Sequence, residues 1–319
     1  MADDRPPRKI ILDCDPGHDD AIALALAHGS PAIDLLAVTT VAGNQTLAKV
    51  TRNARAIAAT FGLTGVPIAA GADRPLVGDL IVAPDIHGET GLDGPALAEP
   101  TDPLDARHAA ELIIDTVLAH QPGEVSLVPV GPLTNIALAA RLEPRITERV
   151  GEVVLMGGAV GPGNRTPVAE FNIWADPEAA HIVFGAPWRV TMIGLDVTHR
   201  ALATPQVRER IRALGSGPAR FVEEMLAFYG GAYRTHQGFS APPVHDPCAV
   251  AYLIDPTMIA TRRAPITVEL AGAATRGMTV VDLRGPTPAG RHRVALDLDA
   301  DRFWDVMIDA IARIGADGG

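Results

Sequence analysis

Residues 9–29 read KIILDCDPGHDDAIALALAHG, and this stretch decides the fold. Its first part, 9–15, is a continuous apolar run ending in polar residues, which is typical of a parallel strand buried on both faces. Its second part, 19–29, begins with two acids and ends at a glycine, as expected of a helix. The Pro16-Gly17 pair between them predicts a tight turn. The stretch therefore predicts a strand, a turn and a helix.

The same alternation continues along the chain. Further strands are expected at 33–43, 66–71, 124–130 and 152–156, and helices at 47–62, 105–120 and 132–142. Strands alternating with helices at this spacing predict βαβ units around a mostly parallel sheet. A smaller group of strands, partly antiparallel, is expected at 264–270, 278–284 and 292–299, before a closing helix from about Asp301. The fold class is α/β, an open, Rossmann-like sheet flanked by helices with a small additional β element.

The composition suits one domain over residues 1–319, with a flexible segment at 1–8. The 319 residues are 47% hydrophobic and only 4% aromatic, which favours helices packed on a buried sheet. No internal repeat or low-complexity linker divides them. The N-terminal MADDRPPRK lacks the apolar core of a signal peptide, and AIALALA is too short to span a bilayer. We therefore expect a cytoplasmic protein with no membrane partner.

Charge and cysteine content restrict the partners and the compartment. The net charge of -11 argues against a nucleic-acid partner, because phosphate binding depends on clustered Lys and Arg. A small or neutral substrate is expected instead. The two cysteines, Cys14 and Cys248, are far apart in apolar segments. Reduced thiols are the favoured interpretation, with a disulfide between them as the alternative.

Four carboxylates follow the first predicted strand: Asp13, Asp15, Asp19 and Asp20. Like charges this close raise one another's pKa unless a cation lies among them. Hard oxygen ligands favour Ca²⁺ or Mg²⁺ over Zn²⁺, and the spacing is not that of an EF-hand. The alternative is that one Asp is a helix N-cap and the others are solvated. This explains one carboxylate and leaves the other three unexplained. We therefore expect a metal site.

Other polar clusters follow other predicted strands, at the edge of the sheet where ligands bind in open α/β folds. Asn44, the segment 130–135 and the segment 156–164 occupy such positions. The loop from Met156 onward contains several glycines but lacks the spacing G-x-G-x-x-G, so a dinucleotide site is unsupported. Its later side chains, Asn164, Glu170 and Asn172, are of the kind that pairs with vicinal hydroxyls. The alternative is a loop with turn-forming glycines and incidental amides.

Two further motifs add possible site residues. His245 and Asp246 precede another predicted helix, where an N-cap beside an ordinary histidine is the commoner arrangement. Asp246 could supply a metal oxygen, and His245 a proton, since its ordinary pKa of ~6.5 allows protonation near neutral pH. Tyr229 and Tyr233 have helical spacing and could simply pack in a core, although the glycines around them also suit a mobile lid.

Together these motifs resemble the inosine-uridine-preferring nucleoside hydrolases, the nucleoside N-ribohydrolase family. The similarity runs over nearly the whole chain, from KIILDCDPGHDDAIA through HGETGLDG, PVGPLTNIALAARLEPRI and VVLMGGAVGPGNRTPVAEFNIWADPEAAHIVF to GLDVTHRALATP and VHDPCAVAYLIDP. The D-x-D-x-x-x-D-D opening is specific to this family when combined with EFNIWADPEA and HDP.

The resemblance implies an enzyme with one calcium ion and a ribonucleoside substrate, and it assigns roles to residues. The implied calcium ligands are Asp15, Asp20, Asp246 and the backbone carbonyl of Val130. Asp15 is also implied as the general base acting on a calcium-bound water, and His245 as the residue that assists the leaving base. The ribose hydroxyls would be bound by Asp19, Asn44, Asn164, Glu170 and Asn172, with the Met156 backbone beside them, and Asp246 is also implied as a substrate-binding residue. The base side would be lined by His87, Tyr229 and Tyr233, with His236 and Gln237 as open alternatives nearby.

The resemblance also implies a homodimer or homotetramer and a role in purine and pyrimidine salvage. Two other functions compete with the hydrolase. A nucleoside phosphorylase or a D-x-D phosphohydrolase would need a phosphate cradle, which the acidic opening disfavours. A nucleoside- or calcium-binding module without turnover would be expected to lack a base or a metal ligand, yet Asp15, Asp20, His245 and Asp246 are all present.

Overall fold

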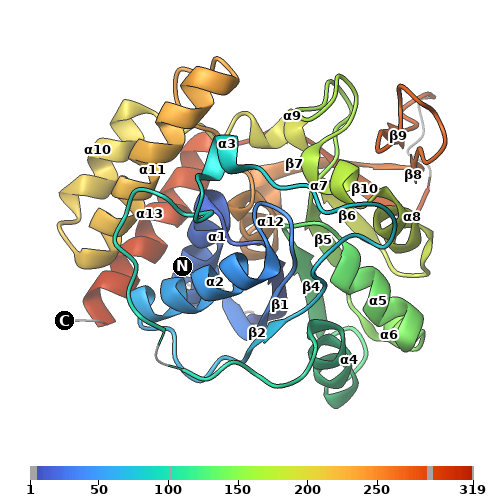
Figure 1. Cartoon of the computed structure of the whole chain (residues 1–319), viewed down its shortest axis with the longest axis horizontal. Coiled ribbons are helices and arrows are strands. Elements are labelled where there is room, and N and C mark those ends of the chain that lie inside the picture. Colours follow the sequence, from blue (N-terminus) through green and yellow to red (C-terminus); the bar gives the residue numbers. More distant parts are fainter. Residues whose placement is uncertain (1–5, 101, 286–289, 318–319) are drawn as a thin grey trace.

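The computed structural model describes residues 6–100, 102–285 and 290–317. Its centre is an 8-stranded sheet in the order β3-β2-β1-β4-β5-β6-β10-β7 (Figure 1). All neighbours pair in parallel except β10 and β7, which are antiparallel. In sheet order the strands are β3 (Ile68–Ala70), β2 (Ile33–Thr40), β1 (Arg8–Cys14), β4 (Val125–Pro129), β5 (Val153–Met156), β6 (Val190–Ile193), β10 (His292–Leu298) and β7 (Ile259–Ala264).

Helices cover both faces of this sheet. One face carries α1 (His18–Gly29), α2 (Leu47–Phe61), α10 (Pro205–Ala213), α11 (Gly217–His236), α12 (Pro247–Ile254) and α13 (Ala300–Asp317). The other carries α4 (Ala109–Ala119), α5 (Thr134–Leu142), α6 (Ile146–Arg149) and α8 (Pro177–Gly185). Short helical turns make up the remaining elements: α3 (Pro84–His87), α7 (Phe171–Ala175), α9 (Leu195–Thr198) and the 3-10 turn η1 (Pro256–Met258).

The two apolar cores follow from the pleat of the strands. Ile10 and Leu12 of β1 belong to the core under α1, whereas Ile11 between them belongs to the core under α4 and α5. Successive side chains of a strand point to opposite faces, so a strand covered on both sides must be apolar throughout. This explains the continuous apolar run of the first strand.

Helix α1 is buried because helices enclose it. Its glycine at position 29 touches α13, since a Cβ there would lie 2.3 Å from the backbone oxygen of Ala310. A side chain at this position would push the two helices apart. The N-terminal and C-terminal parts of the chain therefore share one core.

The expected α/β class and mostly parallel sheet are confirmed, but the C-terminal strands are arranged differently from the prediction. Residues 292–298 form β10, which enters the main sheet parallel to β6 instead of joining a separate group. In the part of the chain that the structure describes, the small antiparallel sheet consists of β8 (Ile266–Val268) and β9 (Thr279–Val281). The edge strand β7 was not expected, because its sequence IATRRA is too polar to read as a buried strand.

Smaller outcomes concern the termini, membranes and thiols. Residues 1–5 of the segment predicted to be flexible lie outside the described residues, and Arg8 is already the first residue of β1. Among the residues described, no helix is both long and apolar enough to cross a bilayer. Cys14 and Cys248 are free buried thiols, whose sulfurs lie near the backbone oxygens of Thr39 and Val244.

Candidate active site

A cavity opens at the carboxyl ends of the central strands, as expected for this class of sheet. Every residue predicted to bind substrate lines it, together with Val130 and His245: Asp19, Asn44, His87, Met156, Asn164, Glu170, Asn172, Tyr229, Tyr233 and Asp246. Asp15 and Asp20 are buried behind this lining. Gln237 reaches the cavity, whereas His236 is exposed at the end of α11 and does not line it.

Asp15 and Asp20 are held together by the turn between β1 and α1. The Asp20 carboxylate accepts hydrogen bonds from the backbone N–H of Asp15 at 3.0 Å and of Gly17 at 2.9 Å. The N-cap of α1 is Gly17, so none of the four acids is the N-cap residue, and Asp20 instead accepts from the N-cap N–H as the third residue of the helix. The backbone N–H of Asn44 donates to Asp15 Oδ2 at 2.6 Å, and its side-chain amide donates to Asp20 Oδ2 at 3.2 Å. These bonds fix both carboxylates.

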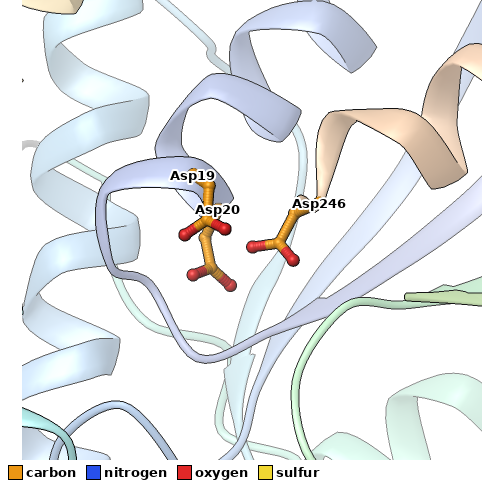
Figure 2. A group of neighbouring side chains, drawn as sticks. All are labelled: Asp19, Asp20 and Asp246. Atoms are coloured by element: carbon orange, nitrogen blue, oxygen red, sulfur yellow. The ribbon is translucent and has the colours of Figure 1, made fainter. Parts of the chain in front are cut away.

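Three of the carboxylates form a compact group. Asp19, Asp20 and Asp246 each offer an oxygen within 4.8 Å of the others, between the starts of α1 and α12 (Figure 2). The ligand set implied by the resemblance instead pairs Asp15, Asp20 and Asp246 with the Val130 carbonyl. Asp15 Oδ1 is buried and has no hydrogen-bond partner among the described residues, so it is free to bind a ligand. Which carboxylates bind a metal stays a prediction.

Burial makes this cluster electrostatically costly. Desolvation, followed by the charges of neighbouring carboxylates, raises the pKa of Asp15 and of Asp246 well above the usual range, and raises that of Asp19 to about 7. None of the ion pairs of the described residues joins a Lys or Arg to these carboxylates. A divalent cation would supply the missing positive charge, and the oxygen-rich donor set suits a hard cation. The site therefore fits the metal predicted from the sequence.

Glycines make room for Asp15. A Cβ on Gly43 would lie 2.2 Å from Asp15 Oδ2, and one on Gly131 would lie 2.5 Å from Oδ1. Gly43 follows β2 and Gly131 follows β4, so the two strands adjacent to β1 both contribute. The backbone approaches the carboxylate from two sides because these positions lack side chains.

The loop between β5 and α7 supplies a polar wall. Glu170 accepts backbone hydrogen bonds from Gly158 at 2.9 Å, Asn172 at 2.9 Å and Ile173 at 3.2 Å. Burial raises the pKa of Glu170 to about 7 despite these bonds. Glu170 is the N-cap of α7, and its bond to Gly158 joins the two ends of the loop.

Asn164 and Asn172 hold backbone groups of the same wall. The Asn172 amide donates to the carbonyl of Val130 at 2.7 Å and to that of Met156 at 3.2 Å. Asn164 Oδ1 accepts from the backbone N–H of Phe171 at 2.9 Å. Asn172 therefore links the carboxyl ends of β4 and β5, and both carbonyls that the resemblance singles out already accept its hydrogen bonds.

His245 lies between two hydroxyl groups. Its Nδ1 is 2.8 Å from Thr198 Oγ1, and its Nε2 is 2.7 Å from the Tyr233 hydroxyl, which in turn lies 3.4 Å from that of Tyr229. Burial lowers the pKa of His245 to about 3. Burial therefore opposes the protonation near neutral pH that the sequence analysis expects of this imidazole, and favours the neutral ring with one proton.

Several residues of the site were not predicted. Asp85, Ile86, Arg165 and Phe171 line the cavity, and Arg165 also lies over the Trp174 ring at 5.1 Å. His18, Asn135 and Thr198 stand behind the lining residues and bond to them or to Asp13. Two of these three carried a sequence signal, because His18 lies within the acidic block and Asn135 lies in the segment 130–135 that follows a predicted strand.

The comparisons with known proteins agree with this geometry. The family model described as "Inosine-uridine preferring nucleoside hydrolase" matches residues 10–305. The chain is 57% identical over 311 residues to an inosine-uridine preferring nucleoside hydrolase of Crithidia fasciculata, covering 97% of this chain and 99% of the relative. It is 46% identical over 308 residues to a pyrimidine-specific ribonucleoside hydrolase RihA of an Enterobacter species, covering 95% and 97%.

A solved structure shares the whole fold. The purine-preferring ribonucleoside hydrolase from Gardnerella vaginalis superposes with a TM-score of 0.90 at 35% identity, covering 97% of this chain and 99% of that one. Fold, cavity and sequence all lead to the same family. The chain belongs to the inosine-uridine preferring nucleoside hydrolases and is an N-glycosyl hydrolase.

Proposed function

We propose that this protein hydrolyses the N-glycosidic bond of ribonucleosides, inosine and uridine among them, to free base and ribose, and that it depends on calcium. The observation that carries the proposal is the buried group of carboxylates, which no cationic side chain of the described residues contacts, placed beside a cavity rich in hydroxyl-binding groups. Relatives are named for inosine-uridine, pyrimidine and purine preference. The 57% identity with the first of these supports inosine and uridine as substrates.

Asp15 is the proposed general base. Its Oδ2 is fixed by the Asn44 N–H, and its Oδ1 makes no hydrogen bond among the described residues. A free oxygen on a fixed carboxylate can take a proton from the water that attacks C1′ of the ribose. Cleavage builds positive charge on the ribose ring, as in other glycosyl transfers, and the surrounding carboxylates stabilise that charge.

The calcium site is proposed to consist of Asp15, Asp20, Asp246 and the Val130 carbonyl. All four contribute oxygen, and the buried cluster has no Lys or Arg in contact among the described residues. When bound, calcium would lower the pKa of water in the site and offset the repulsion among the carboxylates.

The polar wall is proposed to orient the sugar. Asp19, Asn44, Asn164, Glu170, Asn172 and the Met156 carbonyl would bind the ribose hydroxyls, since together they offer both donors and acceptors. A deoxyribonucleoside lacks one hydroxyl and would leave buried polar groups unpaired. We therefore expect uridine to be cleaved much faster than deoxyuridine.

The other side of the cavity is proposed to receive the base. His87, Tyr229 and Tyr233 line it, and Gln237 lies at its edge. His245 would assist departure of the base with its single ring proton, in contact with the Tyr233 hydroxyl at 2.7 Å. We further propose a homodimer or homotetramer that serves nucleoside salvage in the cytoplasm, which light scattering and fractionation can test.

The decisive assay measures reducing sugar released from inosine, uridine, adenosine and cytidine in phosphate-free buffer, before and after removal of calcium by a chelator. Sugar release that is independent of phosphate distinguishes a hydrolase from a phosphorylase. Loss on chelation and recovery with added calcium support the metal dependence. Asp15→Asn should retain nucleoside binding and lose hydrolysis. Undiminished turnover by this variant would rule out the role of Asp15, and binding without turnover in the native chain would favour a binding module.

A further inference from the structure

His18 contacts the site without lining it. This residue begins α1, is buried, and has its ring against that of His87, with the centroids 5.5 Å apart. His87 lines the cavity, whereas His18 does not. His18 Nε2 lies 2.9 Å from the backbone oxygen of Asp93, and its Nδ1 lies 3.2 Å from His87 Nδ1. The two rings thus form a chain that runs from a backbone carbonyl to the cavity.

The protons of this chain can be assigned from its first contact. A carbonyl oxygen only accepts, so His18 Nε2 must carry the proton that is shared with Asp93. A neutral imidazole has one such proton, which leaves His18 Nδ1 as an acceptor. For the 3.2 Å contact to be a hydrogen bond, His87 Nδ1 must carry its proton, and His87 Nε2 is then left as a bare acceptor.

The opposite assignment is worse. The backbone N–H of His18 donates toward His87 Nδ1 at 3.3 Å and by itself favours an unprotonated nitrogen there. With that nitrogen bare, two acceptors face each other either at His18 Nε2 and the Asp93 oxygen, 2.9 Å apart, or at the two Nδ1 atoms, 3.2 Å apart. Two acceptors at these distances repel, whereas a proton on His87 Nδ1 leaves only the longest of the three contacts, that of the His18 N–H, unsatisfied.

The surroundings hold both rings in place. His18 stacks on Phe228 at 5.1 Å and on Tyr229 at 5.3 Å between ring centroids. Gly17 lets His87 approach, since a Cβ there would lie 2.3 Å from His87 Nδ1. His87 Nε2 has no hydrogen-bond partner among the described residues and is not one of their enclosed unpaired atoms. It is therefore available to a ligand in the cavity.

We propose that His18 is a positioning residue that holds His87 in the tautomer with a bare Nε2, so that His87 accepts a hydrogen bond from the nucleoside. This inference rests on the proposed function for the identity of the ligand. The donor is either the ring N–H of a 6-oxopurine or uracil base, or a ribose hydroxyl. Both are N–H or O–H groups, and analogues lacking one or the other distinguish them.

The tautomer is measured first, on the full chain without substrate. Ring nitrogens with and without a proton have well-separated ¹⁵N shifts, and His87→Gln identifies the signals of His87. The expected result is a proton on His87 Nδ1. A proton on His87 Nε2 in the native chain would overturn the proposal. This result does not depend on turnover, so it stands apart from success or failure of the proposed hydrolase.

Two substitutions then test the role of His18. His18→Phe keeps an aromatic ring and removes both nitrogens, whereas His18→Asn restores an acceptor near the position of Nδ1. We expect His18→Phe to move the proton of His87 to Nε2 and to raise KM for inosine about tenfold. His18→Asn should restore the native tautomer and most of the affinity. Phe228→Leu, which removes only stacking on His18, should leave the tautomer unchanged.

Substrate analogues identify the donor. The KM effect of His18→Phe should vanish with 1-methylinosine if the base N–H is the donor, and with the 2′-, 3′- or 5′-deoxy analogue of inosine if the corresponding ribose hydroxyl is. An effect of equal size with all four analogues would overturn the proposed hydrogen bond. A native tautomer of His87 in folded His18→Phe would also overturn it, as would failure of His18→Asn to rescue either measurement.

Discussion

The Asp15 carboxylate lies against the backbone of Gly43, with no room for a β-carbon between them. A Cβ on Gly43 would lie 2.2 Å from Asp15 Oδ2, the oxygen that accepts from the Asn44 N–H. Gly43 lies outside the left-handed region, so the restriction there is spatial. The identity of this glycine is set by the carboxylate beside it.

Gly43→Ala should therefore displace Asp15 and lower kcat by about 10²-fold or more, because small misplacements of a reacting group are costly. Gly231→Ala is the matched control. Gly231 lies in α11 with nothing within 4 Å of an added Cβ, so alanine should leave kcat unchanged and stabilise the helix by about 0.5–1 kcal/mol. Steady-state kinetics and urea unfolding measure both. Normal kcat in Gly43→Ala would contradict the role of Asp15.

Calcium should stabilise the fold, because it relieves repulsion that exists only when the carboxylates are assembled. At a concentration about 100 times Kd, the gain is about 2.7 kcal/mol, which raises Tm by roughly 5 °C. Asp246→Asn removes one carboxylate of the cluster and should abolish most of this rise. Asp34→Asn, at an exposed position of β2, should retain it. Scanning fluorimetry with calcium and with chelator measures the shift, and an equal rise in both variants would place the ion elsewhere.

Glu170→Gln should loosen the loop that joins β5 to α7. Three backbone N–H groups donate to this carboxylate, and an amide would turn an N–H group toward at least one of them. We expect a loss of about 1–3 kcal/mol in the free energy of unfolding and a higher KM. Glu148→Gln, at an exposed site on α6, should change neither. Urea unfolding at pH 8 and inosine kinetics provide the measurement, and unchanged stability would show that the loop is held by other contacts.

The stability of the fold should depend on pH through His292, a residue remote from the site. Burial and the neighbouring Arg291 lower its pKa to about 4, and its Nδ1 accepts from the Val190 N–H at 3.2 Å. A depressed histidine pKa means that the unfolded chain binds the proton first. The stabilising contribution is therefore complete above about pH 6.5 and is lost as pH falls toward 4.

His292→Asn keeps an acceptor for Val190 and cannot titrate. Below pH 6.5, the native chain should lose stability faster than the variant, by up to about 1.4 kcal/mol per pH unit. The other buried histidines remain in both proteins, so only the difference between the two urea curves is interpreted. Parallel loss of stability in the two proteins from pH 7 to 4.5 would contradict this prediction.

Local sequence patterns predicted where helices and strands lie in the chain more accurately than they predicted which elements lie side by side in the fold. The run at 9–15 and the helix after it could be identified because burial and helix ends leave local signals. The place of β10 between β6 and β7 could not, since strand order depends on packing between segments far apart in sequence. The polar strand β7 was not predicted for a related reason: a strand at the edge of a sheet need not be apolar.

The same difference between local patterns and distant contacts applies to the prediction of the site. The acidic block was visible as four carboxylates, residue types alone pointed to Asp246 and the polar loop, and the resemblance then assigned roles to them. The neutrality of His245 and the contacts of His18 and Thr198 were not visible, because burial and hydrogen-bond partners arise only in the folded chain. Residue types therefore indicated the chemistry, while the protonation states required the structure.

The order of strands in the sheet bears on how the protein matures. During synthesis the chain emerges from its N-terminus, so β1 to β6 and most helices are available early, but β6 remains an uncovered edge until β10 pairs with it. Helix α13, which touches α1 near Gly29, is made last. The carboxylate of Asp20 likewise lacks its neighbour Asp246 until that later part of the chain has been synthesised. A nascent chain stalled before β10 would thus expose the unpaired edge of β6 beside an incomplete acidic pocket. The ribosome-bound stage is therefore the one at which the chain most needs a chaperone.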